Sequence, residues 1–243
     1  MNRSIKIFPT PQDLAESFAS DLAKSINKAA EKNEYITVAL SGGNTPKLLF
    51  SLLAEKYSQS VDWNYVHLFW VDERCVPPDD PESNFGMTNR FLLSRIKIPK
   101  KNIHRIRGEA DPVKEAERYS AEIMKYTLQK NHLPSFNIMI LGMGDDGHTA
   151  SIFPGNTKLF SVKKFCDTAV HPVSGQRRIT LTGKVINNAG EIFILVTGGK
   201  KAKIMNEIFS KNENSAMFPA AHINSNNGST NWLLDEEAAN NFK

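Results

Sequence analysis

Short apolar runs alternate with amphipathic stretches along almost the whole chain. The run Ile138–Leu141 is apolar at every position, which is typical of a strand that is covered on both faces. Such runs predict a set of short strands joined by helices. The predicted strands are Ile5–Phe8, Ile36–Leu40, Val66–Val71, Phe136–Leu141 and Glu191–Thr197, with a weaker candidate at Ile179–Leu181.

Helical patterns occupy the segments between these runs. Within Pro11–Glu31, every fourth residue from Leu14 to Ile26 is apolar, so one apolar stripe runs along the helix. The other predicted helices are Pro46–Tyr57, Asp111–Gln129 and Lys201–Phe209. This alternation predicts an α/β fold with a mainly parallel sheet, helices on both faces and functional residues at the carboxyl ends of the strands. Because no repeat or long linker divides the sequence, we expect a single domain over residues 1–243.

Composition excludes several classes of protein. With 243 residues, 40% hydrophobic and 23% charged, the chain has the composition of a globular protein rather than a disordered one. The net charge of +4 is scattered, so neither a nucleic-acid partner nor a membrane partner is expected. The two cysteines, Cys75 and Cys166, have no metal-binding spacing, and no apolar run is long enough to span a bilayer. We therefore expect a cytoplasmic protein.

A glycine-rich turn follows the predicted strand Ile36–Leu40. Glycines allow a close approach of ligand to backbone, and a helix start offers free N–H groups to an anion. A turn that uses its glycines for geometry alone is the alternative. The residues of the turn are Ser41, Gly42, Gly43, Asn44 and Thr45.

Charged residues follow the next predicted strand. Because successive residues point to opposite sides, Asp72 and Arg74 are expected to share a face while Glu73 turns away. Two carboxylates and an arginine directly after a buried strand are poorly explained by packing. A solvated strand end with a local ion pair is the alternative.

A third turn, Gly-Met-Gly-Asp-Asp-Gly-His, follows the predicted strand Phe136–Leu141. It places Asp146 two residues before His148. A carboxylate beside an imidazole fixes its tautomer and raises its basicity, which general-base chemistry needs. An ordinary Asp/Gly turn with an incidental histidine is the alternative. The other five histidines lie in no comparable context, and we assign them no role.

Two clusters of cations lie nearer the C-terminus, at Arg177-Arg178 and Lys200-Lys201. The planar guanidinium group of arginine and the compact ammonium group of lysine are both suited to binding a phosphate group. Each cluster taken alone is also compatible with a solvated face.

Together these blocks closely resemble the 6-phosphogluconolactonases of the glucosamine-6-phosphate isomerase/deaminase superfamily. The matching blocks are SGGNTP (41–46), VDERCVP (71–77) with SN at 83–84, LGMGDDGHTASIFPG (141–155), RRITLT (177–182), GGKKA (198–202) and the final WxxD (232–235). The resemblance implies a Rossmann-like α/β fold and hydrolysis of 6-phospho-D-glucono-1,5-lactone to 6-phospho-D-gluconate, in the oxidative pentose phosphate pathway. It implies no metal or organic cofactor, makes the sugar-phosphate lactone the expected partner, and leaves the oligomeric state open.

The resemblance also implies roles for individual residues. His148 would be the base that activates water, and Asp146 would orient it. The phosphate would lie on the loop Gly42–Thr45, with Arg74, Arg178 and Lys201 as candidate cations. Lys201 matches the family's lysine better than Lys200, although this placement could slip by one residue. Asn44 stands where the family more often has serine.

Two related classes are the alternatives. One is an amino-sugar-phosphate deaminase, in which a glutamate follows the histidine by five residues; here that position is Phe153. The other is a sugar-phosphate-sensing domain, which normally follows a helix-turn-helix segment. A strand at Ile5–Phe8 leaves no room for such a segment, and the Asp146–His148 pair favours catalysis.

Overall fold

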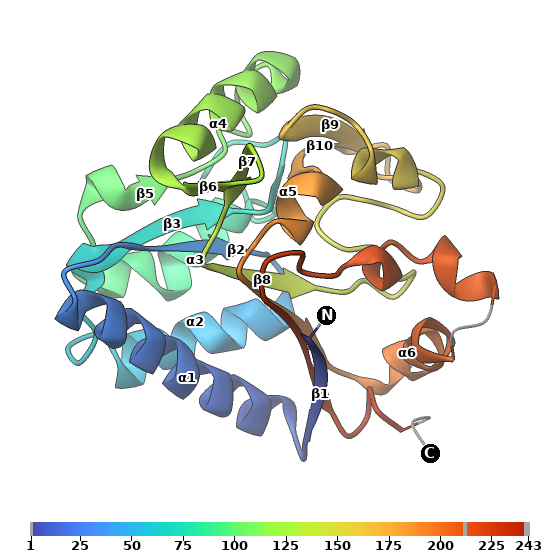
Figure 1. Ribbon diagram of the computed structural model, residues 1–243, viewed down its shortest axis with the longest axis horizontal. Coiled ribbons are helices and arrows are strands. Elements are labelled where there is room, and N and C mark those ends of the chain that lie inside the picture. The colour runs from blue at the N-terminus through green and yellow to red at the C-terminus, as the bar shows by residue number, and fades with distance from the viewer. Residues whose placement is uncertain (1, 211–212, 241–243) are drawn as a thin grey trace.

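The computed structural model describes residues 2–210 and 213–240, and their centre is a seven-stranded sheet (Figure 1). Every neighbouring pair of strands in this sheet runs parallel. In spatial order the strands are β1 (Asn2–Phe8), β12 (Ser229–Asp235), β11 (Glu191–Val196), β8 (Ile138–Gly142), β2 (Ile36–Leu40), β3 (Val66–Trp70) and β5 (Ile103–His104).

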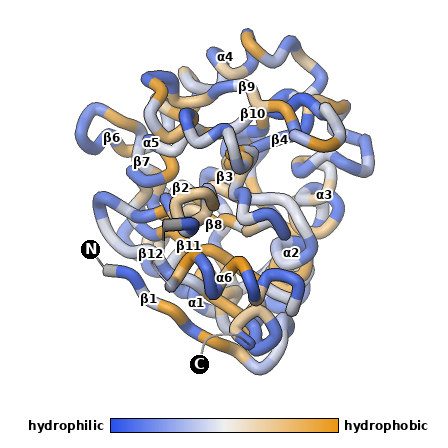
Figure 2. The backbone as a smooth tube through the Cα atoms, turned by 90° about the vertical axis from the view of Figure 1, so that its right-hand side faces the viewer, coloured by the Kyte–Doolittle hydropathy of each residue, from blue (hydrophilic) through white to orange (hydrophobic). Residues whose placement is uncertain are grey.

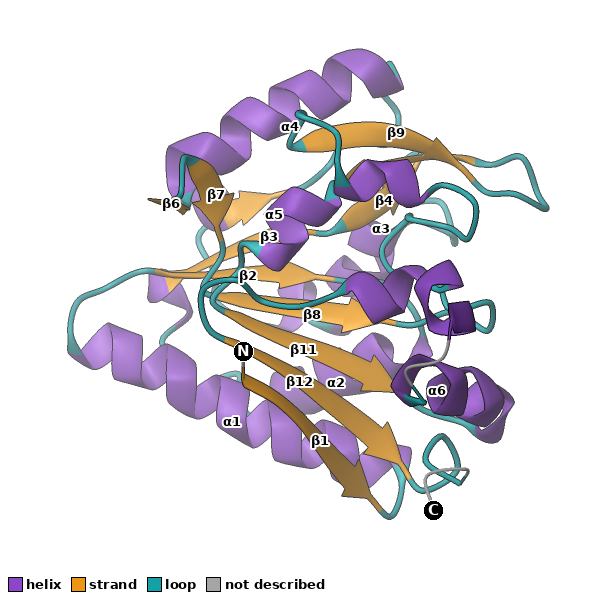
Figure 3. Cartoon of the chain, turned by 45° about the vertical axis from the view of Figure 1, so that its right-hand side comes forward, coloured by secondary structure: helices purple, strands orange, loops and turns teal. Residues whose placement is uncertain are grey.

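Helices cover both faces of the sheet. Two long helices lie side by side on one face, while α4 and α5 lie beyond the other, and α6 lies near the carboxyl ends of the strands (Figures 1 and 3). The predicted fold class, an α/β Rossmann-like fold with a mainly parallel sheet, is confirmed. None of the helices in the described residues is long and apolar enough to cross a bilayer. The helices are α1 (Pro11–Glu31), α2 (Asn44–Lys56), α3 (Asn84–Phe91), α4 (Pro112–Tyr126), α5 (Gly183–Asn187) and α6 (Ala202–Phe209).

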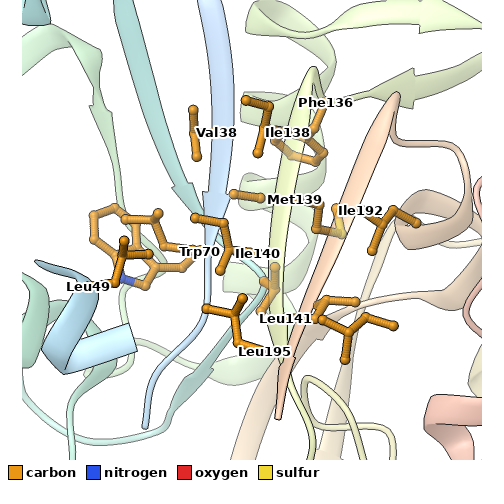
Figure 4. Close-up of a cluster of buried hydrophobic side chains, with 14 of the residues drawn as sticks. Val38, Leu49, Trp70, Phe136, Ile138, Met139, Ile140, Leu141, Ile192 and Leu195 are labelled. Carbon is orange, nitrogen blue, oxygen red and sulfur yellow. The ribbon is translucent and has the colours of Figure 1, made fainter. Parts of the chain in front are cut away.

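The core is built around strand β8. All four side chains of Ile138–Leu141 are buried, and they pack with Val38 of β2 and Ile192 of β11 (Figure 4). Figure 2 shows hydrophobic stretches alternating with hydrophilic ones along the chain. Burying a large apolar side chain contributes about 1.5–3 kcal/mol. The predicted strand with an apolar residue at every position is therefore a buried strand between β11 and β2.

A second sheet, which the sequence did not predict as a unit, extends the fold beyond β3. It is antiparallel, with the order β4 (Asp72–Arg74), β10 (Arg177–Leu181) and β9 (Cys166–Val170). Arg178 of β10 pairs in register with Arg74 of β4. The polypeptide leaves β3 at Trp70 and, after Val71, enters this second sheet, so the predicted strand Val66–Val71 is one residue too long.

One helix prediction is wrong at its end. Helix α4 ends at Tyr126, whereas we expected Asp111–Gln129, and residues 128–130 form a hairpin with 133–135. The two residues of its turn, Asn131 and His132, both have positive φ, at 54° and 59°. This is the two-residue turn that matches the twist of antiparallel strands, so the turn rather than the apolar pattern decides where the helix stops. The hairpin strands are β6 (Leu128–Lys130) and β7 (Leu133–Ser135).

Candidate active site

The loop between β2 and α2 presents the start of a helix to the carboxyl edge of the sheet. Gly43 occupies the N-cap position with φ of 110°, a conformation that side chains rarely adopt. No side chain caps α2, so the first N–H groups of the helix remain available to an anion. The hydroxyls of the loop form hydrogen bonds within the protein instead, because Ser41 donates to the Ile140 carbonyl and the Thr45 hydroxyl is hydrogen-bonded to that of Thr197.

The second wall of the site comes from β4 and β10. Asp72 is buried, and it accepts a hydrogen bond of 2.6 Å from the Ser151 hydroxyl. Arg178 lies 3.9 Å from Asp72 and is 9% exposed. Burial and the neighbouring Arg74 both lower the pKa of Arg178. In the described part of the chain, the Nε atoms of Arg74 and Arg178 are buried without a hydrogen-bond partner, which leaves both guanidinium groups with donors to spare.

Glu73 faces away from Asp72 and Arg74, as the alternation along a strand predicts. Its carboxylate accepts hydrogen bonds from the first turn of α3. Burial raises the pKa of Glu73, and the backbone N–H groups of Phe85, Asn84 and Arg74 oppose this effect. Glu73 therefore belongs to the support behind the site rather than to its surface.

The third turn pairs His148 with Asp146. Imidazole Nδ1 lies 2.5 Å from the Asp146 carboxylate, which also accepts the His148 backbone N–H. Burial tends to raise the pKa of Asp146, but the hydrogen bonds from His148 outweigh it and the pKa is lowered. A Cβ at Gly144 would lie 2.2 Å from the imidazole ring, so only glycine fits beneath it. The Phe153 ring packs at 4.9 Å on the same imidazole.

Lys201 reaches the site from the start of α6. It faces the cleft, whereas its neighbour Lys200 is exposed and does not line it. Burial lowers the pKa of Lys201, and Asp145 and Asp235 oppose this shift. Asp235 also accepts the N–H of Gly198 with both carboxylate oxygens, and so holds the turn that precedes Lys201.

One cleft of about 190 Å³ brings these segments together. Of the site residues expected from the sequence, Asp146 alone does not line the cleft, and it contacts the lining residue His148. The cleft is also lined by Asn84, Gly144 and Ala150, to which the sequence analysis assigned no role; Asn84 had appeared only within a matching block. The expected residues that line the cleft are Ser41, Gly42, Gly43, Asn44, Thr45, Asp72, Arg74, His148, Arg178 and Lys201.

The charges of the cleft favour an anion. Three cations line it against the single carboxylate of Asp72, and the uncapped start of α2 adds a partial positive charge. Among residues 2–210 and 213–240, no group of three or more His, Cys, Asp or Glu side chains is placed to hold a metal ion. The fold and the site together define an α/β enzyme with a histidine–carboxylate pair beside a cleft lined by cations.

More specifically, the chain belongs to the family described as glucosamine-6-phosphate isomerases/6-phosphogluconolactonase, whose model matches residues 9–232. The 6-phosphogluconolactonase of Aggregatibacter actinomycetemcomitans is 43% identical over 233 residues, which cover 96% of this chain and 97% of the relative. The resemblance found in the sequence is thereby confirmed.

Solved structures show the same relationship. The crystal structure of devB protein is 41% identical and superposes with a TM-score of 0.93, over 99% of this chain and 100% of that chain. The structure of 6-phosphogluconolactonase from Trypanosoma brucei is 26% identical and superposes with a TM-score of 0.90, over 100% and 99% of the two chains. The similarity therefore extends over the entire sheet and all segments of the cleft.

Proposed function

We propose that this protein hydrolyses 6-phospho-D-glucono-1,5-lactone to 6-phospho-D-gluconate, a step of the oxidative pentose phosphate pathway. The observation that carries the proposal is the cleft, in which a histidine–aspartate pair lies beside three cations and an uncapped helix start. The names of the relatives support the choice of substrate.

The phosphate group is assigned to the cationic part of the cleft. The N–H groups that start α2 and the side chains of Arg74, Arg178 and Lys201 are all suited to a dianion. Asp72 carries a negative charge and is therefore a poor phosphate ligand. Its carboxylate is better suited to a sugar hydroxyl or to holding Arg178.

His148 is assigned as the general base. Because Nδ1 donates to Asp146, Nε2 is left free to accept a proton. Water loses a proton to Nε2 as its oxygen attacks the lactone carbonyl. The tetrahedral intermediate then collapses, the bond to the ring oxygen breaks, and that oxygen takes the proton back from the imidazolium. Asp146 stabilises the imidazolium between these two steps.

Phe153 favours lactone hydrolysis over deamination. It is fully buried against His148 and carries no proton to exchange, at the position where the deaminases have a glutamate. Hydrolysis needs one base, whereas aldose–ketose isomerisation must move protons between adjacent carbons.

Enzyme assays test the proposal directly. Purified protein is expected to accelerate the decay of freshly prepared 6-phosphogluconolactone above its spontaneous rate, and to release no measurable ammonia from glucosamine 6-phosphate. Ammonia release at a rate comparable with lactone hydrolysis would favour the deaminase. Decay at the spontaneous rate would exclude the lactonase.

A cytoplasmic location is also proposed. Cys75 and Cys166 are both free thiols, which suits a reducing compartment. Fractionation of the source cells with a cytoplasmic marker tests this assignment.

A further inference from the structure

Glu73 is a buried carboxylate behind the cleft that contacts two of the segments forming it. It is 2% exposed. One oxygen accepts the backbone N–H groups of Arg74 at 2.8 Å and Asn84 at 2.7 Å. The other accepts the Phe85 N–H at 2.8 Å and the Ser83 hydroxyl at 3.1 Å. One side chain thus ties strand β4 to the first turn of α3.

Asn84 continues this connection to the opposite wall. Its side-chain nitrogen donates to the Asp72 carbonyl at 2.9 Å and lies 3.3 Å from the Asp72 carboxylate. Its side-chain oxygen lies 1.8 Å from the place that a Cβ on Gly42 would occupy. Asn84 therefore fills the space between β4 and the loop that starts α2, and only glycine at position 42 leaves room for it.

We propose that Glu73 and Asn84 form a brace that fixes the separation between the loop Ser41–Thr45 and the cations Arg74 and Arg178, which makes Glu73 a positioning residue for the phosphorylated substrate. The identity of that substrate rests on the proposed function. A dianion that is held from both walls binds tightly only when the walls already stand at the right distance.

The same contacts also make the N-termini of α2 and α3 different in what their N–H groups can bind. Glu73 and Ser83 take the first N–H groups of α3, because Ser83 accepts from Gly86 while Glu73 accepts from Asn84 and Phe85. The start of α2 has no such cap. The two helices begin close to one cleft, and the brace leaves only α2 with N–H groups for the ligand.

A matched control separates positioning from simple helix capping. Glu115 is 3% exposed and accepts hydrogen bonds from the Arg107 N–H and from the Arg118 side chain. It belongs to α4 and does not line the cleft. Glu115→Gln removes a buried charge of the same kind without touching the brace.

The experiment compares Glu73→Gln, Asn84→Ala, their double variant and Glu115→Gln. Calorimetry with 6-phospho-D-gluconate gives Kd, and steady-state assays with the phosphorylated lactone give KM and kcat. We expect each brace variant to raise Kd and KM about tenfold with little change in kcat, because a phosphate-binding group that shifts out of reach costs about one charge-assisted hydrogen bond to the ligand. The double variant should bind no more weakly than the worse single variant, because both act through one brace. Glu115→Gln should lower Tm and leave Kd unchanged.

Other outcomes would overturn the proposal. If Glu73→Gln lowers Tm as Glu115→Gln does and leaves Kd unchanged, Glu73 is a helix cap alone. Losses that add in the double variant would show that the two residues act separately. Should Glu73→Gln fail to fold, Asn84→Ala keeps the caps on α3 and tests the same brace. If wild-type protein binds 6-phospho-D-gluconate but does not hydrolyse the lactone, the proposed function fails, and the binding data still decide about the brace.

Discussion

Arg74 and Arg178 stand directly opposite each other on neighbouring antiparallel strands. Like charges in this position are destabilising, and burial adds the loss of water around Arg178. The fold keeps both guanidinium groups on the wall of one cleft. A dianionic ligand between them would relieve the repulsion, which is why we assign the pair to binding rather than to stability.

Removal of one arginine of this pair is expected to lower kcat/KM for the phosphorylated substrate alone. Arg178→Ala should lower kcat/KM for 6-phosphogluconolactone roughly 10–150-fold, because a charge-assisted hydrogen bond is worth about 1.5–3 kcal/mol. Unphosphorylated gluconolactone serves as the control substrate in the same assay. An equally large loss with both lactones would show that Arg178 does not bind the phosphate.

Loss of the proposed base is expected to lower kcat while leaving the affinity for ligand almost unchanged. His148→Ala should lower kcat by about 10²–10⁴-fold, since general-base assistance contributes this factor. The affinity for 6-phospho-D-gluconate should change little, because the cations and the start of α2 remain. Stopped assays and calorimetry measure the two quantities on one preparation. Near-normal kcat in this variant would assign the base elsewhere.

The Asp146–His148 contact is expected to depend on pH in a defined sense. The pKa of Asp146 in the folded protein is lowered, so its contribution to stability is complete above the ordinary carboxyl pKa of about 4 and is lost as the pH falls through the lowered value. Asp146→Asn removes this contribution. Denaturant titrations should show a difference in unfolding free energy between the two proteins that shrinks as the pH falls below about 4. A difference that is unchanged or larger in strong acid would contradict the shift.

The two neighbouring lysines provide a matched pair of variants. Lys201→Ala should raise KM for the phosphorylated lactone about tenfold, as the loss of one ionic hydrogen bond predicts. Lys200→Ala should leave KM unchanged, because Lys200 is exposed and outside the cleft. The reverse result would show that the lysine of the family pattern is Lys200.

The sequence predicts the central strands of the parallel sheet because they are short, mainly apolar runs such as Ile138–Leu141. It does not predict β12, since the first three residues of Ser229–Asp235 are polar and only Trp232–Leu234 are apolar. The second sheet also escapes prediction, apart from Ile179–Leu181 within β10: β4 has only three residues, and all of them are charged. Pairing with β10 rather than a pattern of its own makes this segment a strand.

For the site, spacing alone suggests that Asp146 and His148 form a pair and that Asp72 and Arg74 share a face. Spacing does not reveal which residues far apart in the sequence come into contact in the fold. Asn84 contacts Gly42 although 42 positions separate them in the sequence, and Asp235 holds the turn before Lys201. Contacts of this kind depend on tertiary packing, which local sequence does not encode.

The pairing of β1 with β12 has a consequence for biosynthesis. Among the strands of the sheet, Asn2–Phe8 is made first and its partner Ser229–Asp235 is made last. During translation β1 therefore has unpaired backbone N–H and C=O groups until β12 is made. Such unpaired strands favour pairing with other chains. Asp235 belongs to the same strand, so the turn that precedes Lys201 obtains its carboxylate only after the other strands of the sheet have been made. A nascent chain released before Ser229 would lack both the last strand of the sheet and the carboxylate that supports the turn before Lys201, the cation proposed to bind substrate.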